Sequence, residues 1–562
     1  MNSRNYVRRV DNRVERVEQG SMNFGHRPSE KFTSTSMDIP KGSSRVDVSP
    51  VPSLRAHAHA QSDEPLATTL STLSPLPAWF EPTPFPYQLE GAIRASEQNH
   101  TLIADEPGLG KTLQALATAV MLGAQRVLVI APPVLLANWG REITRTHHLE
   151  HIDSAELATI TPSTKKVTAA ALPAAGYIIV SDAMLVSRRT LPALLADWAP
   201  DLVIIDEAHR MKNPSAKRTR AAQQIAAAAG KTIALTGTPI ISTPLDVLPL
   251  LDMLGHLHWF PGGTRRTFEA RYTSPDRWNN PRPVKRMLPE LHALLEAFVW
   301  TRRTKSEVLK DLPAKLRTTH TVTPSHDEYV AAHKDLDAAV SKYLAHTPVI
   351  DMEQLNAWAS ENRRYVSQLR RATGLAKIEP AVEWIREHHD GAPERPLIVW
   401  GIHRAVLDGL AEQLAPHMRV ATIHGGTGHA ERDEIVQRFQ AGDIDVLIGQ
   451  IVAAGVGLTL TRSSDVLFVE TDWTPAGIVQ AEDRVHRIGQ TAHVQITTLI
   501  AERTLDAKIH ATLATSIQTL NHLTPGSDHA VTDAAGGATV RDVLVGLVLD
   551  RHITRLTNGA AA

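Results

Sequence analysis

From about residue 78 onward, the chain alternates short apolar runs with longer amphipathic stretches. Each run is a block of β-branched and aliphatic residues, which is typical of strands buried on both faces, while the stretches between them have helical periodicity. This alternation predicts a parallel sheet with helices on both sides. The first runs are TLIA (101–104), RVLVIAP (126–132), YIIVS (177–181), DLVIID (201–206) and KTIALTGT (231–238).

The same alternation returns in the second half of the chain. It predicts an α/β fold with two parallel-sheet lobes in tandem. Between them, residues 255–375 hold basic and aromatic residues and then a long helical pattern around 326–372, so we expect a helical extension of the first lobe and a connector. The later runs are PLIVWG (396–401), RVATIHG (419–425), DVLIGQ (445–450), DVLFVE (465–470) and VQITTLI (494–500).

The two ends of the chain lack this pattern. The first 77 residues are rich in Ser, Pro, Arg and Asp and cannot offset their ordering entropy, so we expect a disordered tail. Valines 7, 10, 14 and 17 would share one stripe of a short helix, a candidate for binding a partner or DNA, but two heptads are too few for a coiled coil, and a fluctuating solvated segment is favoured. The end is rich in Gly, Thr and Ala, and we expect weak order there apart from a helix-like DVLVGLVLDRHI. The expected domains are a tail (1–77), a first lobe (78–254), an extension and connector (255–375), a second lobe (376–515) and a C-terminal segment (516–562).

Composition narrows the function classes. The chain has no cysteine, which excludes disulfides, thiolate metal sites and thiol nucleophiles. Its 59 Lys and Arg residues nearly balance 60 Asp and Glu residues, so nucleic-acid binding would need a local patch. No long apolar run or signal segment is present, so we expect no membrane partner. We expect the cytoplasm or nucleoid in a prokaryote or virus, and the nucleus in a eukaryote.

A glycine loop follows the first predicted strand. The sequence ADEPGLGKT (104–112) lies between an apolar run and a good helix. Gly108 and Gly110 let the backbone turn its N–H groups onto phosphate oxygens, Lys111 reaches the β- and γ-phosphates, and Thr112 can hold Mg²⁺. The general phosphate-loop pattern has glycine where Asp105 stands, so GLGKT carries the prediction.

Two adjacent carboxylates end another predicted strand, in DLVIIDEAH (201–209). Carboxylates at the C-terminal end of a parallel strand face the ligand crevice. We expect Asp206 to hold Mg²⁺ through water and Glu207 to orient or deprotonate the attacking water. None of the histidine spacings suits a metal site, so Mg²⁺ is the one metal expected.

These motifs resemble the superfamily-two helicase-like ATPases, and within them the Swi/Snf-type DNA translocases, with a lean toward the HARP-like annealing-helicase subgroup. The resemblance covers about residues 80–510, and it departs from the family at Val180-Ser181-Asp182, where Ser-Tyr is usual. The matching motifs are PYQ (86–88), ADEPGLGKT, LVIIDEAHRMKN, LTGTP (235–239), RRTKSEVLKDLPAK (302–315), AAGVGLTLT (453–461) and QAEDRVHRIGQ (480–490).

The resemblance implies RecA-like lobes with an ATP site in the cleft between them, and ATP and Mg²⁺ as cofactors. Tyr87 and Gln88 look like the motif that reads adenine. In the second lobe, the resemblance assigns Gly455 and Gly457 to the nucleotide.

Arg484 and Arg487 lie three residues apart on a predicted helix, hence on one face, and could reach across a cleft between the lobes. In relatives this pair completes the nucleotide site. Lobe closure would deliver the arginines to the phosphates, and hydrolysis would reopen the cleft, shifting the lobes along a strand that both hold.

Contacts to DNA should be neutral to sequence, because a motor must slide along it. By motif, the candidates are Asn138 and Trp139 in the first lobe and His424, Gly425 and Thr459 in the second. A basic patch could come from Arg265-Arg266, Arg302-Arg303-Lys305, Arg363-Arg364 or Arg370-Arg371.

The function that these residues favour is a DNA-stimulated ATPase that translocates on double-stranded DNA, including forked or branched DNA, to remodel DNA structures or protein–DNA complexes. A strand-separating DNA or RNA helicase and an ATP-gated DNA-binding module without motor activity stay open as alternatives. The N-terminal tail is a candidate site for a protein partner.

Overall fold

The computed structural model describes residues 6–10, 13–17, 76–147, 156–164, 167–240, 243–275, 281–323, 327–347, 350–451, 458–472, 475–502, 504–507, 509–510, 544–549 and 551–552. Residues 1–53 form one unit and residues 54–562 another. Within the described ranges, no helix is both long enough and apolar enough to cross a bilayer.

The first unit contains two short strands, β1 (Tyr6–Val10) and β2 (Arg13–Val17), which pair antiparallel. The helix considered for the valines of this segment is therefore wrong, and residues 1–5, 11–12 and 18–75 of the predicted disordered tail lie outside the described residues. β-Branched valines restrict χ1 and favour an extended backbone.

In the described part of the chain, the first lobe holds a seven-stranded sheet in the order β11-β3-β8-β7-β4-β6-β5, with every neighbouring pair parallel. The strands are β3 (His100–Ile103), β4 (Arg126–Ala131), β5 (Glu156–Ile160), β6 (Gly176–Ser181), β7 (Leu202–Ile205), β8 (Lys231–Leu235) and β11 (Trp300–Thr301). Each of the five predicted runs supplies one of these strands, and this confirms the parallel sheet.

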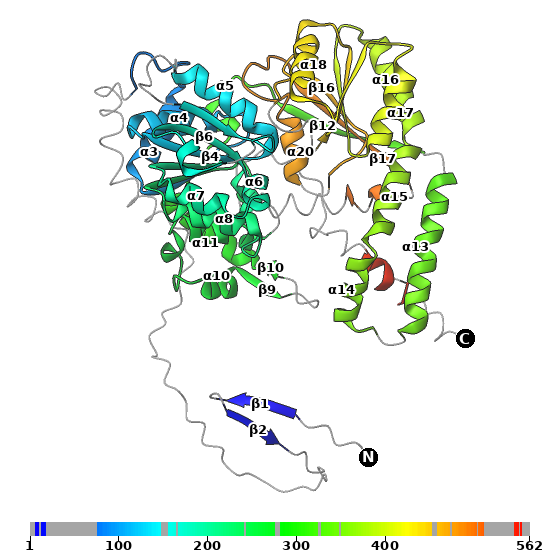
Figure 1. The fold of residues 1–562 in the computed structure, drawn as a ribbon. Coiled ribbons are helices and arrows are strands. Elements are labelled where there is room, and N and C mark those ends of the chain that lie inside the picture. The colour runs from blue at the N-terminus through cyan, green and yellow to red at the C-terminus, as the bar shows by residue number, and fades with distance from the viewer. Residues whose placement is uncertain are drawn as a thin grey trace. The chain divides into compact units, whose positions relative to one another are not determined.

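Helices cover both faces of this sheet (Figure 1). Along β4, Leu128 and Ile130 join the core on one face while Val127 and Val129 join the core on the other, so successive side chains are all buried. The helices are α3 (Pro86–Glu97), α4 (Lys111–Met121), α5 (Leu136–His147), α6 (Asp182–Ser187), α7 (Leu191–Asp197), α8 (Lys217–Ala226), α9 (Leu248–Met253), α10 (Arg265–Tyr272) and α11 (Leu288–Phe298).

The second lobe holds a six-stranded sheet among the described residues, again parallel throughout, in the order β12-β17-β16-β13-β15-β14. Helices α16 (Ile378–Gly391), α17 (Arg404–Leu414), α18 (His429–Ala441) and α20 (Pro475–Glu482) belong to this lobe. The strands are β12 (Lys315–Val322), β13 (Leu397–Gly401), β14 (Val420–Ile423), β15 (Val446–Gln450), β16 (Asp465–Phe468) and β17 (Val494–Ala501). The predicted fold class, two parallel-sheet lobes in tandem, is confirmed.

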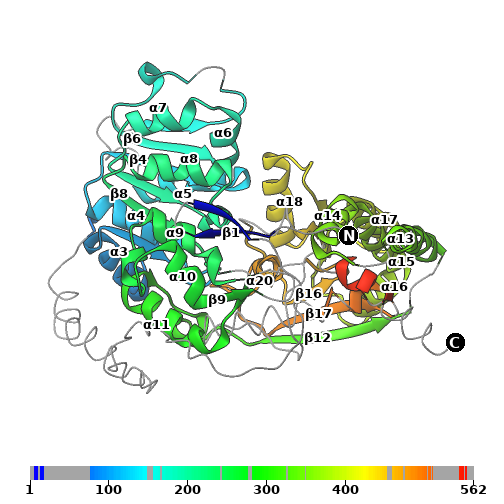
Figure 2. The same cartoon turned by 90° about the horizontal axis from the view of Figure 1, so that it is seen from below.

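The segment predicted as extension and connector differs from the expectation in one respect. It contributes β11 to the first sheet and β12 to the second, where β12 runs beside β17 (Figure 2). Both are edge strands, and most of β12 is exposed, so its sequence lacks the apolar run that marks a central strand.

The segment also contains β9 (Thr273–Pro275) and β10 (Pro281–Pro283), which pair antiparallel, and its later part is helical, as expected. Helices α13 (Asp327–His346), α14 (Met352–Glu361) and α15 (Arg363–Ala376) share a core, and the predicted C-terminal helix joins it through Leu544, Val545 and Val548. The domain boundaries themselves remain predictions.

Candidate nucleotide site

The glycine loop between β3 and α4 closes around the ammonium of Lys111. Gly108 and Gly110 have φ angles of +89° and +76°, a left-handed conformation that glycine adopts without strain. Lys111 Nζ donates to the carbonyl oxygens of Asp105 at 2.7 Å and Glu106 at 3.1 Å, and burial lowers the pKa of this ammonium. The loop thus holds a cation inside it, where a phosphate oxygen would be a stronger acceptor than a carbonyl.

The two acidic residues at the start of the loop tie it to the segment after β11. Asp105 accepts from the backbone N–H of Arg303 at 2.9 Å and from Gln114 Nε2 at 2.8 Å. Glu106 accepts from the backbone N–H of Lys305 at 2.7 Å. These bonds explain why a carboxylate stands at Asp105, where the general loop pattern has glycine.

The DNA patch predicted at Arg302, Arg303 and Lys305 is wrong, because these side chains bind the loop or Asp483. Arg302 Nη1 donates to Ala104 O at 2.6 Å, and Arg303 pairs with Asp105 at 3.3 Å with 12% of its side chain exposed. The side chain of Lys305 is 6% exposed. These cations are paired inside the protein and are therefore not available to bind DNA.

The carboxylate pair lies at the end of β7, where it was predicted. Asp206 Oδ2 accepts from the indole Nε1 of Trp139 at 2.8 Å, and Asp206 Oδ1 accepts from the Glu207 N–H at 2.8 Å. Glu207 Oε2 lies 3.1 Å from His209 Nδ1, which in turn lies 3.0 Å from Thr236 Oγ1. Glu207 has φ of +48°, an uncommon angle for a non-glycine residue. Several bonds therefore fix both carboxylates.

The two carboxylates differ in their electrostatics. Burial and the neighbouring charge of Glu207 raise the pKa of Asp206 to about 6, although the hydrogen bond from Trp139 opposes this. Burial also disfavours ionised Glu207, but His209 and Lys111 outweigh it and lower the pKa of Glu207. A cation bound beside the two carboxylates would stabilise the ionised form of both.

Trp139 does not have the role predicted for it. Its side chain is fully buried and donates to Asp206, so the side chain is not available to DNA. Asn138, its neighbour at the beginning of α5, is half-buried. The motif thus places one residue near the surface and the next against the predicted metal ligand.

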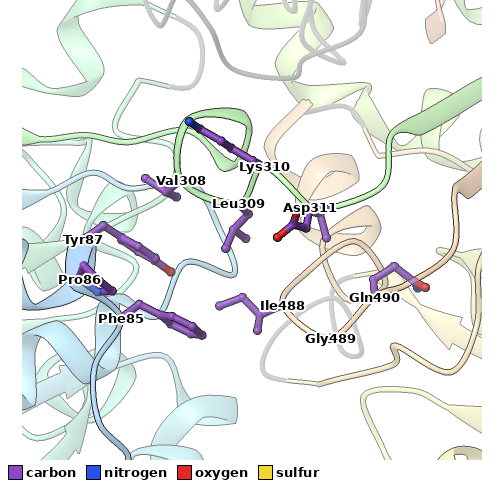
Figure 3. Close-up of a pocket in the computed structure, with 11 residues that line it drawn as sticks. Phe85, Pro86, Tyr87, Val308, Leu309, Lys310, Asp311, Ile488, Gly489 and Gln490 are labelled. Carbon is purple, nitrogen blue, oxygen red and sulfur yellow. The ribbon is translucent and has the colours of Figure 1, made fainter.

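The predicted adenine-reading residues lie on the other side of the loop. Tyr87 Oη and Gln88 Nε2 each donate to the Leu109 carbonyl at 3.1 Å, and burial raises the pKa of Tyr87 to about 12. The ring of Phe85 is parallel to that of Tyr87, with centroids 6.0 Å apart. Beside these rings lies a pocket of about 450 Å³ (Figure 3). Its lining comes from three segments, 85–87, 308–312 and 488–490.

The predicted arginines lie close to the phosphate loop, but α20 ends at Glu482, so they lie on the turns after it and the helix predicted for them is wrong. Arg487 Cβ is 3.3 Å from the position that a Cβ on Gly108 would take. Gln480 Nε2, one turn before Arg484, donates to Glu207 Oε2 at 3.5 Å. Burial and the charge of Arg487 lower the pKa of Arg484 to about 10, and the charge of Glu207 opposes this. The structure therefore brings the arginine segment of the second lobe onto the loop and the carboxylates of the first.

A buried ionic network that the sequence did not predict lies behind these arginines. Lys305 Nζ is 2.7 Å from Asp483 Oδ1, and Lys315 Nζ is 2.8 Å from the same oxygen and 3.2 Å from Glu482 Oε2. Arg317 donates to Glu482 at 2.6 and 2.9 Å. We refer to these five residues as the connector network. The adjacent acids Glu482 and Asp483 were the feature of the sequence that could have indicated this network.

The candidates for DNA contact in the second lobe are at the surface. His424 and Gly425 follow β14 directly, and Thr459 is exposed. Gly455 and Gly457 lie outside the described residues.

The remaining basic clusters stay predictions. Within them, Arg265 forms an ion pair with Asp252 at 2.6 Å, Arg363 donates to Ser360 O at 2.9 Å, and Arg370 donates to Thr471 O.

Comparison with known families finds two matches along this architecture. The SNF2-related domain matches residues 87–378, and the helicase conserved C-terminal domain matches residues 380–489. The first match includes the glycine loop, the carboxylate pair and the connector, and the second includes the arginine segment.

Individual relatives are similar over the same region. A SWI/SNF-related matrix-associated actin-dependent regulator of chromatin subfamily A-like protein 1 from Xenopus tropicalis is 31% identical over 432 residues, which are 75% of this chain and 43% of the relative. The human DNA annealing helicase and endonuclease ZRANB3 is 31% identical over 439 residues, 75% of this chain and 38% of the relative. The chain thus spans less than half the length of these relatives. Among solved structures, the Sulfolobus solfataricus SWI2/SNF2 ATPase core in complex with dsDNA is 24% identical with a TM-score of 0.38, covering 78% of this chain and 92% of that one.

Proposed function

Since the chain belongs to the family of proteins with an SNF2-related domain, we propose that it is a DNA-dependent ATPase that translocates on double-stranded DNA to remodel DNA structures or protein–DNA complexes. The observation that carries the proposal is the approach of Arg487 to the glycine loop. Its Cβ is 3.3 Å from the Cβ position of Gly108, so an arginine of one lobe lies at the phosphate loop of the other.

In the proposed mechanism, the first lobe binds the nucleotide. The adenine would enter the pocket beside Phe85 and Tyr87, where an aromatic face can stack on a base. The phosphates would lie on the glycine loop. The Lys111 ammonium would then donate to phosphate oxygens in place of the carbonyl oxygens of Asp105 and Glu106.

The oxygen donors of Thr112 and Asp206 fit the preference of Mg²⁺ for hydroxyl and carboxylate ligands. The rigid placement of Asp206 by Trp139 and by the Glu207 N–H supports this assignment. When bound, Mg²⁺ neutralises charge on the phosphates. Glu207 would orient the attacking water and accept its proton, and its low pKa keeps it anionic for this task.

The arginines would act in the transition state. Charge spreads over the oxygens of the transferred phosphoryl group, and a positioned arginine stabilises it by a factor of roughly 10³ to 10⁵ in rate. Arg484 lies near Glu207, and Arg487 lies at the loop. Because the two lobes contribute to one site, hydrolysis would change how the lobes are held together, and a strand bound by both would be moved.

The test is ATP turnover by the full chain without nucleic acid and then with single-stranded, double-stranded and forked DNA and with RNA. We expect duplex DNA to stimulate turnover most, with forked DNA at least as effective, in line with relatives that are named annealing helicases. Stimulation by RNA alone, or unwinding of a labelled duplex, would favour a strand-separating helicase. Binding of ATP and DNA without turnover would favour the ATP-gated binding module.

A further inference from the structure

A run of positive charge follows the carboxylate pair of the first lobe. The chain as a whole is nearly neutral, with 59 basic and 60 acidic side chains, yet residues 208–245 contain no Asp or Glu. We refer to the basic residues of this stretch around the beginning of α8 as the α8 basic patch. They are Arg210, Lys212, Lys217, Arg218 and Arg220.

A buried carboxylate holds two members of this patch. Asp182 is 2% exposed, and its Oδ2 accepts from Arg210 Nε at 2.8 Å and from Arg218 Nη1 at 3.1 Å. The side chains of Arg210 and Arg218 are 36% and 40% exposed, so each keeps N–H donors in contact with solvent. One negative charge thus fixes two positive ones, and the cluster carries an excess of positive charge at the surface.

Sheet topology places this cluster beside the predicted DNA contacts of the first lobe. Strands β7, β4 and β6 are neighbours and parallel, so their carboxyl ends lie at one edge. Asp182 follows β6, Arg210 follows β7 and Asn138 follows β4. Lys212, Lys217 and Arg220 are exposed next to them.

We propose that the α8 basic patch binds the phosphate backbone of double-stranded DNA, and that Asp182 holds Arg210 and Arg218 in place for it. Arginine matches phosphate with two parallel N–H donors, and a side chain that is already fixed loses less entropy on binding. The inference rests on the proposed function, since it assigns a further part of its DNA surface.

The first experiment measures binding of labelled duplex DNA by anisotropy, as a function of salt, together with ATP turnover. We expect Arg218→Gln to weaken duplex binding about tenfold, to lower the slope of log affinity against log salt by about 0.9, and to leave turnover without DNA unchanged. Lys217→Gln, which does not touch the buried carboxylate, should act in the same direction. Arg386→Gln, an exposed arginine of α16, is the matched control and should change neither quantity.

The outcomes separate this inference from the proposed function. If duplex DNA neither binds to nor stimulates the unaltered chain, the proposed function fails. If duplex DNA stimulates it but Arg218→Gln and Lys217→Gln keep full affinity and the full salt slope, the patch is not a DNA contact. If these two variants bind RNA more weakly but bind duplex DNA normally, the assignment is also overturned.

A second variant tests the anchor. Asp182→Asn adds net positive charge to the patch, so simple attraction would strengthen duplex binding. We expect weaker binding instead, because the two arginines lose the carboxylate that orients them. Tighter binding by Asp182→Asn would overturn the anchoring role.

Discussion

At the scale of single residues, hydrogen bonds decide which predicted site residues can reach their targets. Trp139 belongs to a motif predicted to touch DNA, yet its indole N–H donates to Asp206 at 2.8 Å from a fully buried side chain. Its neighbour Asn138 is half-buried at the beginning of the same helix. Asn138, the residue proposed for DNA contact, and Trp139, which binds the proposed metal ligand Asp206, are therefore neighbours on α5.

Replacing Trp139 by Phe should affect chemistry more than DNA binding. The ring is retained while the donor to Asp206 is lost, and a hydrogen bond to a charged group contributes about 1.5–3 kcal/mol. We expect DNA-stimulated turnover to fall about tenfold or more and the Mg²⁺ requirement to rise, with duplex affinity unchanged. Turnover titrated with Mg²⁺, alongside duplex binding and the melting temperature, checks this. Weaker duplex binding at full turnover would restore the role in DNA contact.

His486 should make stability depend on pH. Its Nε2 lies 2.7 Å from Pro313 O, and burial with the charges of Lys315 and Lys305 lowers its pKa from 6.5 to about 4. Between these values the unfolded chain binds a proton that the folded chain does not, so the free energy of unfolding falls as pH drops through this window.

We expect that loss to be at most about 1.4 kcal/mol per pH unit from this residue. Urea unfolding at several pH values, compared with His486→Gln, measures it. The variant keeps a donor for Pro313 and cannot titrate, so its slope should be shallower. Identical slopes would exclude this histidine as the source.

At the scale of elements, the connector is the part whose placement matters most. It begins with β11 in the first sheet, passes through α12 (Lys305–Val308) and continues as β12 in the second sheet. Lys305 contributes to the connector network from the first lobe, while Lys315 and Arg317 contribute from β12. The network therefore links both sheets to the two acids that precede the arginines.

The connector network should be sensitive to the loss of its most buried cation. Lys315 and its partner carboxylates are each 3% exposed, whereas Arg317 is 21% exposed. Breaking a buried pair leaves an uncompensated charge, so Lys315→Met should lower the free energy of unfolding by about 3–5 kcal/mol. Arg317→Met should cost clearly less, because Arg317 is partly exposed and Glu482 keeps Lys315 as a partner. Urea unfolding compares them, and an equal or reversed order would contradict the burial argument.

At the scale of the whole molecule, the proposed nucleotide site is assembled from two lobes. Its loop and carboxylates come from the first lobe, its arginines come from the second, and the pocket proposed for the base is lined by residues 85–87, 308–312 and 488–490. We therefore expect that removing an arginine of the second lobe lowers the rate of hydrolysis much more than it lowers nucleotide affinity.

Arg487→Ala should lower DNA-stimulated turnover by roughly 10³ or more while ATP affinity falls little. Arg487→Lys should not rescue it, because a point charge on a flexible stem does not replace the planar guanidinium. Single-turnover hydrolysis and nucleotide binding measure the two effects. Nearly full turnover in Arg487→Lys would mean that another group supplies the transition-state charge.

Removal of residues 1–75 should leave melting temperature and basal turnover nearly unchanged. The described core residues begin at Phe80, and the strands β1 and β2 belong to the separate unit 1–53. Differential scanning calorimetry of the shortened chain tests this. A fall of several degrees would show that the tail contributes to the core of the lobes.

The sequence by itself determined those features whose signal is local. Strands buried on both faces appear as apolar runs, so the central strands of both sheets and the helices between them were predictable. The glycine loop and the carboxylate pair were predictable for the same reason, since a strand, a turn and a helix in succession position their own polar residues.

Tertiary structure decided the features that depend on neighbours distant in sequence. The edge strand β12 has little apolar signal, and its partner β17 is supplied much later in the chain. Arg303 and Lys305 resemble part of a surface patch in the sequence, but Asp105 and Glu106 bind their backbone N–H groups. Trp139 resembles a surface contact, but its indole N–H donates a hydrogen bond to Asp206. Burial and pairing of a polar group depend on which distant segment the fold brings against it, and no local pattern of residues carries that information.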